Sequence, residues 1–436
     1  MILLDYANYD ASRLKDNFGA PEYSYLFVKS AFRPILETLG RRIEVKDPAR
    51  EVDAIYREAQ ARGEPCFFLP FCPPNTMPLG LACPTIPVFA WEYDRIPDEV
   101  WNRDPREDWT WGLAQTAGAI THCQSAAAAI RRGMGDAYPL TVAPAPLFEK
   151  YAHGGSPARG WREPFDLLVE GGLALSAGDI DLTPFRPDRP RAEAMRALRV
   201  LENAVADTDR PAQRLRLEGV VYTSVLNPYD GRKNWGDLIA GFVWAFRNTP
   251  TATLVLKLTR FDLEDGLYSV LRFLSTLGSF ACRVILVQGL LSDPAYRALI
   301  DATSYALNTA FGEGQCLPLM EYMAGGRPAV APAHTAMADY VSPDNSFVIP
   351  SDPCAAPWPH DERRALRCTH YRIGFADFVR RCRESYAFAR DDCAGYAAMS
   401  AAAVDAMRDF CSEDLVTARV KQLLQPLIAR AAADAV

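Results

Sequence analysis

Two carboxylates flank a glycine-rich turn in the stretch GEGQCLPLMEYMAGGRPAVAP, which runs from Gly312 to Pro332. Glu313 precedes the turn, and Glu321 follows it after seven intervening residues, about one turn into an expected helix that begins at Leu317. The free N–H groups of a helix N-terminus and the helix dipole together bind anions, phosphates above all. We expect these groups to be presented by the backbone of the turn, at Gly314, Gln315, Cys316 and Leu317.

The two carboxylates indicate a second chemical group in the ligand. A carboxylate beside a diphosphate is repelled unless hydroxyl groups donate hydrogen bonds to it. Glu321 is placed to reach a ribose diol, and Glu313 to reach the hydroxyls of a sugar beyond the phosphates. Because a nucleotide-sugar satisfies all of these features, we predict that the turn binds one.

The rest of the chain must position this turn, and its length and pattern indicate two domains. At 436 residues the chain exceeds what a single hydrophobic core usually supports. Short apolar strands alternate with helices in two series, which predicts an α/β fold with two doubly wound Rossmann-like domains. The expected bounds are 1–153 for the N-terminal domain, 154–214 for a linker with an inserted helical segment, 215–410 for the C-terminal domain and 411–436 for a C-terminal helix.

One long stretch of the C-terminal part, 351–374, has no clear periodicity. It contains Trp358, His360 and several prolines. Loops of this length inside a compact domain tend to be functional or disordered. We expect an irregular, ordered loop that faces a ligand.

Composition argues against several classes of protein. The net charge is −7 and there is no long basic run, so nucleic acid is not the expected partner. No apolar stretch approaches the roughly 20 residues that span a bilayer, so we expect no transmembrane segment. The 11 cysteines include no CxxC pair, which favours reduced thiols and a cytoplasmic location over disulfides or a zinc site. Peripheral contact with a membrane stays open.

The pattern around the two glutamates resembles a known family. An E-x7-E spacing that encloses G-x-x-L-P and precedes A-x-G-x-P closely resembles the retaining glycosyltransferases of family 4. The resemblance covers roughly 219–347, and more loosely the whole chain. It implies the GT-B fold, in which the two Rossmann-like domains face each other across a cleft. The C-terminal domain would bind the nucleotide-sugar, the N-terminal domain the acceptor, and a final helix would cross back to the N-terminal domain.

The resemblance also implies donor-binding residues. In the family, the first strand of the C-terminal domain is followed by an Arg and, six residues later, a Lys that hold the donor diphosphate. Lys233 occupies the Lys position, but Asn227 stands where the Arg is usual. We expect Arg232 to supply the missing charge, so that Arg232, Lys233 and Glu313 are the candidate catalytic residues. The strand and turn that read the base correspond to Val287, Gln288 and Leu290.

Three donor-side positions need a separate interpretation. The Gly-Phe-Gly-Leu usual after the first glutamate reads Gly314-Gln315-Cys316-Leu317 here. We expect Gln315 to alter which sugar fits. Cys316 has no His or Asp beside it in sequence, so we interpret it as a small residue in a tight turn and not as a nucleophile. Lys257, at the end of a strand, could face the cleft, but we expect it to be exposed.

The acceptor side is less well marked. The first loop of the N-terminal domain offers Asn17 and Gly19 near the donor phosphates. The segment FAWEYDRIP offers Trp91 as a platform for a sugar face, with Glu92 or Asp94 lining the acceptor site. His122 follows a strand that reaches the cleft in relatives, although a core or loop histidine is the favoured interpretation.

We therefore expect a retaining glycosyltransferase that moves a sugar from a nucleoside diphosphate sugar to a hydroxyl acceptor. Lipid-linked or oligosaccharide acceptors of bacterial polysaccharide or glycoconjugate synthesis are the default, with no cofactor and no metal. Two alternatives stay open. A nucleotide-sugar epimerase of the same architecture would turn over its donor without an acceptor. A non-catalytic partner of another transferase would bind the nucleotide-sugar without turnover; Asn227 favours this alternative weakly, while Glu313, Glu321 and Lys233 argue against it.

Overall fold

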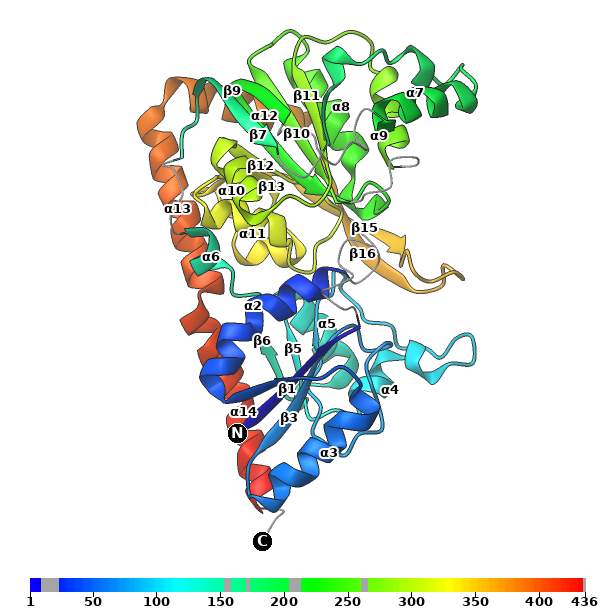
Figure 1. Cartoon of the computed structure of the whole chain (residues 1–436), viewed down its shortest axis with the longest axis vertical. Helices are drawn as coiled ribbons and strands as arrows, with labels where there is room; N and C mark the ends of the chain where they lie inside the picture. The colour runs from blue at the N-terminus through cyan, green and yellow to red at the C-terminus, as the bar shows by residue number, and fades with distance from the viewer. Residues whose placement is uncertain (9–22, 153–157, 170–172, 204–212, 260–265, 434–436) are drawn as a thin grey trace.

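The chain folds around two sheets, one in each half of the sequence (Figure 1). A computed structural model describes residues 1–8, 23–152, 158–169, 173–203, 213–259 and 266–433. The first sheet has the order β2-β1-β3-β4-β5-β6, and its strand pairs are parallel. Its strands are β1 (Ile2–Ala7), β2 (Arg41–Glu44), β3 (Cys66–Phe71), β4 (Val88–Phe89), β5 (Ala119–Thr121) and β6 (Leu140–Val142).

Helices cover this sheet because their apolar residues recur every three or four positions. In α2 the side chains of Tyr25, Val28, Phe32 and Leu36 are buried, and they face the sheet core. The remaining helices of this half are shorter than α2. The helices are α2 (Ser24–Leu39), α3 (Pro48–Ala61), α4 (Trp109–Leu113), α5 (Gln124–Met134) and α6 (Phe148–Ala152).

The second sheet has the order β14-β13-β12-β9-β10-β11-β8. The strands from β9 to β14 pair in parallel and are nearly continuous runs of buried apolar residues, as expected for strands covered on both faces. They are β9 (Gln213–Leu226), β10 (Ala252–Leu258), β11 (Arg283–Gln288), β12 (Tyr305–Leu307), β13 (Ala329–Pro332) and β14 (Ser346–Ile349). The helices of this half are α7 (Arg191–Asn203), α8 (Trp235–Phe246), α9 (Gly266–Ser275), α10 (Asp293–Ala302), α11 (Leu317–Ala324) and α12 (Phe375–Asp391).

Two segments differ from the expectation. The stretch 154–214, expected to be a linker with an inserted helical segment, also contributes β7 (Arg162–Val169) and β8 (Leu173–Ser176), which pair antiparallel with β9 and β11. Its helix α7 packs in the core of the second half. The stretch 351–374, expected to be irregular, is an antiparallel hairpin of β15 (Ser351–Pro357) and β16 (Arg367–Ile373).

Two C-terminal helices connect the halves. In Figure 1, α13 (Cys393–Cys411) runs down the side of the molecule beside α11, and α14 (Glu413–Ala433) continues to the first half. Val416, Val420 and Leu424 of α14 are buried in the core that contains α2. The last described helix therefore packs against the N-terminal half of the chain.

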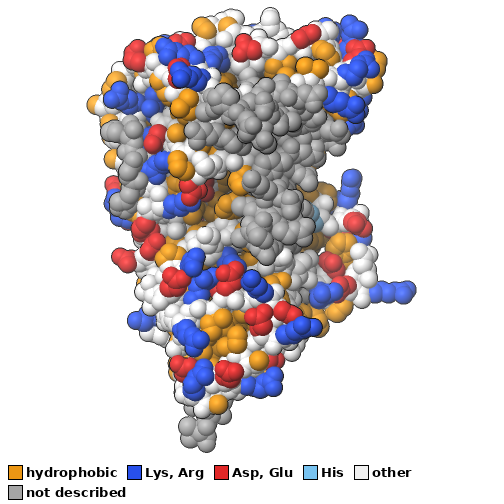
Figure 2. Space-filling model, in the orientation of Figure 1, with side chains coloured by type: hydrophobic (Ala, Val, Ile, Leu, Met, Phe, Trp, Pro, Cys, Tyr) orange, Lys and Arg blue, Asp and Glu red, His pale blue; other side chains and the backbone are white. Residues whose placement is uncertain are grey.

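The described surface carries mixed charges, and the described helices are not of the membrane-spanning type. On the face drawn in Figure 2, side chains of both signs are interspersed over the described parts of both halves. Among the described helices, none combines the length and apolar character needed to cross a membrane.

Gly219 marks the point where β9 leaves β7 and begins to pair with β10. Its φ of +70° is left-handed, and an added Cβ would lie 2.0 Å from the carbonyl oxygen of Thr251. We expect Gly219→Ala to lower the free energy of unfolding by more than about 2 kcal/mol, because backbone strain and a backbone clash add. Gly63→Ala is the matched control, since Gly63 has a φ of +67° with open space around its Cβ position. Equal losses of melting temperature in the two variants would contradict this account.

Candidate active site

The turn between β12 and α11 has the expected strand–turn–helix form, with α11 beginning at Leu317 and Gly325 as its C-cap residue. Cys316 is the N-cap residue and has a left-handed φ of 63°. Glycine would adopt that conformation with less strain than cysteine does. Burial raises the pKa of the Cys316 thiol to about 12. The thiol is therefore protonated at neutral pH, which agrees with a turn residue and not with a nucleophile.

The glycines of the turn allow the N-terminal domain to approach. A Cβ on Gly314 would lie 2.9 Å from the Cβ of Ala90, and one on Gly312 would lie 3.0 Å from the carbonyl oxygen of Glu92. Gln315 is buried, and its Oε1 accepts a 2.6 Å hydrogen bond from the backbone N–H of Ala145. The side chain of Gln315, expected to select the sugar, thus joins the two domains in this structure.

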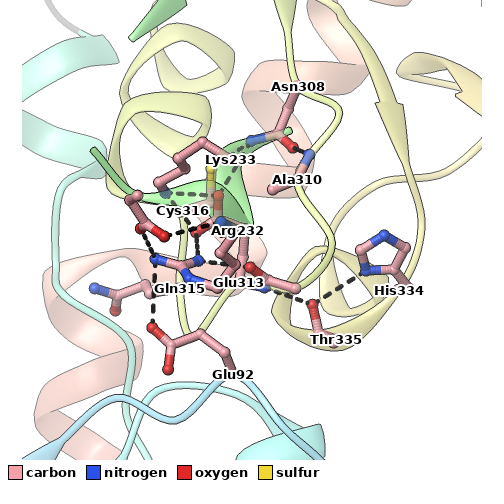
Figure 3. A network of polar contacts seen from close by, with 12 residues as sticks. Glu92, Arg232, Lys233, Asn308, Ala310, Glu313, Gln315, Cys316, His334 and Thr335 are labelled. Atoms are coloured by element: carbon pink, nitrogen blue, oxygen red, sulfur yellow. Dashed lines mark hydrogen bonds and ion pairs between the residues drawn. The ribbon is translucent and has the colours of Figure 1, made fainter. Parts of the chain in front are cut away.

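Glu313 lies at the centre of an ion cluster (Figure 3). Its Oε1 accepts a 2.8 Å hydrogen bond from Lys233 Nζ, and its Oε2 accepts one of 2.9 Å from Arg232 Nη1. Arg232 also pairs with Asp230 at 2.9 Å and lies 3.6 Å from Glu92 of the other domain. The three candidate catalytic residues are therefore in contact.

Local structure explains how both cations reach Glu313. Lys233 and Arg232 lie in a 3-10 turn, η5 (Gly231–Lys233), whose N-cap residue Asp230 accepts a hydrogen bond from the N–H of Arg232. Asn227 lies at the start of the loop that leads to η5, and its Oδ1 accepts a hydrogen bond from the N–H of Tyr229. Asn227 thus shapes the loop that carries the cations.

The cluster is buried and its charges oppose each other. Burial alone would raise the pKa of Glu313, which is 3% exposed, but Lys233 and Arg232 lower it to about 2. Burial alone would lower the pKa of Lys233, but Glu313 raises it. With Asp230 and Glu92 included, three carboxylates face two cations, so both cations are neutralised in the absence of a ligand.

Glu321 lies apart from this cluster, one turn into α11. Its Oε2 accepts a 2.6 Å hydrogen bond from the hydroxyl of Tyr296 on α10, and Tyr151 on α6 lies against Tyr296 in an edge-to-face contact. Burial raises the pKa of Glu321, and the Tyr296 hydroxyl lowers it in part. Contact with a ribose stays a prediction.

An unexpected cation, Lys257 of β10, lies beside the end of β11 that is expected to contact the base. Val287 and Gln288 are buried at the end of β11, and Leu290 is half-buried. Lys257 pairs with Val287 in register and is 3% exposed, so the expectation of an exposed lysine is wrong. Its Nζ donates to the carbonyl oxygens of Leu258 and Gly289, and burial lowers the pKa of Lys257 to about 7.

The acceptor-side expectations have mixed outcomes. Glu92 faces the ion cluster through Arg232. Trp91 is buried against Trp109 and Trp358, which contradicts a role as an open platform for a sugar. The carboxylate of Asp94 accepts from the N–H and hydroxyl of Thr369. Asn17 and Gly19 lie outside the described residues.

His122 is a core histidine, as favoured from the sequence. It is 0% exposed, its Nδ1 lies 2.9 Å from the carbonyl oxygen of Ala143, and its ring contacts Phe32. Burial lowers the pKa of His122 to about 4, so the imidazole is neutral at pH 7.

Sequence reasoning missed three residues around Glu313. The amide of Asn308 donates to Glu313 at 3.4 Å and to the sulfur of Cys316 at 3.2 Å. The hydroxyl of Thr335 accepts from the N–H of Glu313, and His334 lies beside Thr335. The one available signal was position, because Asn308 follows β12 and His334 follows β13 at the same sheet edge. In the described part of the chain, no three His, Cys, Asp or Glu side chains come together as metal ligands.

The ion cluster makes stability depend on pH. The pKa of Glu313 falls from its usual 4.5 to about 2 on folding, so its contribution is present above pH 4.5 and is lost as the pH falls towards 2. We expect Glu313→Gln to lower the free energy of unfolding by about 3 kcal/mol at pH 7, because Lys233 loses the carboxylate that accepts its hydrogen bonds and Arg232 loses one of its carboxylate partners. The difference between wild type and variant should shrink between pH 4.5 and 2 in urea titrations. A difference independent of pH would contradict the ion cluster.

Comparisons with known proteins place this geometry in a fold. No protein-family model matches the chain, and no curated protein sequence matches it significantly. Among solved structures, Staphylococcus aureus TarM is similar with a TM-score of 0.50 and 9% identity over 83% of the chain, which spans only 55% of TarM. Anabaena HepE in complex with UDP has a TM-score of 0.51 and 13% identity over 98% of this chain and 99% of HepE. Sucrose-phosphate synthase from Thermosynechococcus elongatus has a TM-score of 0.52 and 13% identity over 98% of this chain and 99% of that protein. At these identities the similarity shows the fold, and the chain has the GT-B fold of two facing Rossmann-like domains.

Proposed function

We propose that the chain is a glycosyltransferase that uses a nucleoside diphosphate sugar as donor. The observation that carries this proposal is the ion cluster at the carboxyl edge of the second sheet, where Glu313 pairs with Lys233 and Arg232 opposite Glu92 of the other domain. In doubly wound sheets this edge binds ligands. The UDP in the HepE complex and the UDP and glucose in a second HepE complex are ligands of that protein, and they support the same ligand class here.

The cations and the carboxylate have complementary roles in this proposal. Lys233 and Arg232 would exchange Glu313 for the donor diphosphate and stabilise the negative charge that develops on the leaving group. Glu313, released from both cations, would accept hydrogen bonds from the sugar hydroxyls. Glu321 would accept hydrogen bonds from the ribose. Retention of the anomeric configuration, family 4 membership and a metal-independent reaction without a cofactor belong to the proposal.

A hydroxyl of a lipid-linked or oligosaccharide acceptor would approach from the N-terminal domain, where Glu92 faces the cluster. A role in bacterial polysaccharide synthesis, a cytoplasmic location and peripheral contact with a membrane are part of this proposal.

A thermal-shift panel with UDP, GDP, dTDP, ADP and CMP tests the donor site. One nucleoside diphosphate at 100 times its dissociation constant should add about 2.7 kcal/mol of stability to the wild type. Lys233→Ala and Glu321→Gln should lose this gain, whereas Lys421→Ala, at an exposed position of α14, should retain it. No shift with any nucleotide would overturn the proposal. Binding without turnover would identify the non-catalytic partner, and donor turnover without acceptor would identify the epimerase.

Glu313→Gln separates phosphate binding from transfer. Glu313 competes with the diphosphate for Lys233 and Arg232, and a charge pair at 4 Å is worth about 4 kcal/mol near a protein surface. We therefore expect the variant to bind UDP at least about tenfold more tightly by calorimetry, while transfer falls about 100-fold or more. Weaker binding of UDP in the variant would contradict competition for the cations.

A further inference from the structure

The hairpin of β15 and β16 extends from the C-terminal domain to the N-terminal domain. Its Trp358 is 6% exposed and packs against both Trp91 and Trp109, with ring centroids 5.6 and 6.2 Å away. Both of these tryptophans belong to the N-terminal domain, where they also contact each other at 4.6 Å. A buried aromatic cluster of this kind is a strong anchor, because aromatic side chains bury large areas in specific geometries.

Polar contacts fix the hairpin on both sides of this anchor. The carboxylate of Asp94 accepts hydrogen bonds from the N–H and the hydroxyl of Thr369 at 2.7 and 3.0 Å. At the tip, Arg363 lies over the ring of Trp101 and 3.4 Å from Glu99. The tip itself is ordered by the buried carboxylate of Asp361, which accepts from the N–H groups of Ala365 and Leu366.

The base of the hairpin is attached to the loop of Glu313. The N–H of Tyr371 donates a 2.8 Å hydrogen bond to the carbonyl oxygen of Phe311, two residues before Glu313. The rings of Phe311 and His370 stack at 5.0 Å, and those of Tyr371 and His334 stack at 4.6 Å. One element therefore connects the Glu313 loop to Trp91, which immediately precedes Glu92.

The hairpin also lies on the opposite side of the molecule from the connecting helices. In Figure 1, α13 and α14 join the two domains along one side of the molecule, and the hairpin lies between the domains on the other side. A domain pair connected along one side can open on the other, and the hairpin closes that side.

We propose that Trp358 is a positioning residue, which through its hairpin holds the two domains at the separation where Glu92 meets Arg232. Its effect on transfer rests on the proposed function, whereas its effect on domain separation does not. In the closed arrangement, one carboxylate from each domain, Glu92 and Glu313, pairs with the guanidinium of Arg232. Without the anchor, the domains separate and the two halves of the site lose their alignment.

Small-angle X-ray scattering of the full chain without nucleotide tests the separation. We expect Trp358→Ala to raise the radius of gyration by about 1 Å over the roughly 22 Å of a compact chain of this length. Trp358→Phe should restore most of the compact form. Asp94→Ala changes an exposed side chain outside the core, and it should also raise the radius of gyration. Trp244→Ala, at a 61% exposed tryptophan of α8, is the matched control and should change nothing.

Binding and turnover provide the second readout. Because Lys233 and Glu321 belong to the C-terminal domain, the dissociation constant for UDP should stay within about twofold in Trp358→Ala, while turnover of UDP-glucose falls at least about tenfold. If none of UDP, GDP, dTDP, ADP and CMP binds even to the wild type, the proposed function is wrong and the scattering result alone decides on the hairpin. An unchanged radius of gyration in both Trp358→Ala and Asp94→Ala would overturn the positioning role.

Discussion

A buried carboxylate held between two cations is the interaction on which the rest of the site depends. Glu313 is almost fully buried between Arg232 and Lys233. Removing one member of a buried ion pair leaves the charge of the other without its partner, which destabilises the fold. The cluster joins the loop after β9 to the turn after β12, which are about 80 residues apart in sequence. The two loops therefore keep one fixed relation, and a ligand anion must compete with a carboxylate that is already in place.

The domain interface beside this cluster is close-packed. Glycines at 312 and 314 let the turn approach the end of β4, and Gln315 bonds to the backbone at Ala145. Helices α13 and α14 hold one side of the interface, and the hairpin holds the other. The position of Glu92 relative to Arg232 thus follows from the packing that surrounds the site, and not from the 3.6 Å ion pair between these two residues alone.

Local pattern made α11 and its turn predictable, because a proline in the first turn, an apolar run and a terminal glycine pair act within a few residues. Contacts between distant segments were not predictable in this way. Trp91 appeared to be a free aromatic because its partner Trp358 is more than 260 residues away, on a hairpin whose strands contain Pro353 and Pro357. Proline is confined to edge strands, so its presence favoured a loop. Lys257 was misplaced for a similar reason, since one of its partners is the carbonyl oxygen of Gly289, which follows the neighbouring strand β11.

A crystal structure of the chain with UDP would test the central claim most directly. The account predicts that Lys233 Nζ and the guanidinium of Arg232 contact diphosphate oxygens and that the 2.8 Å bond from Lys233 to Glu313 is broken. It also predicts that the ribose lies against Glu321. UDP bound elsewhere, or bound with Glu313 still held by both cations, would contradict the account.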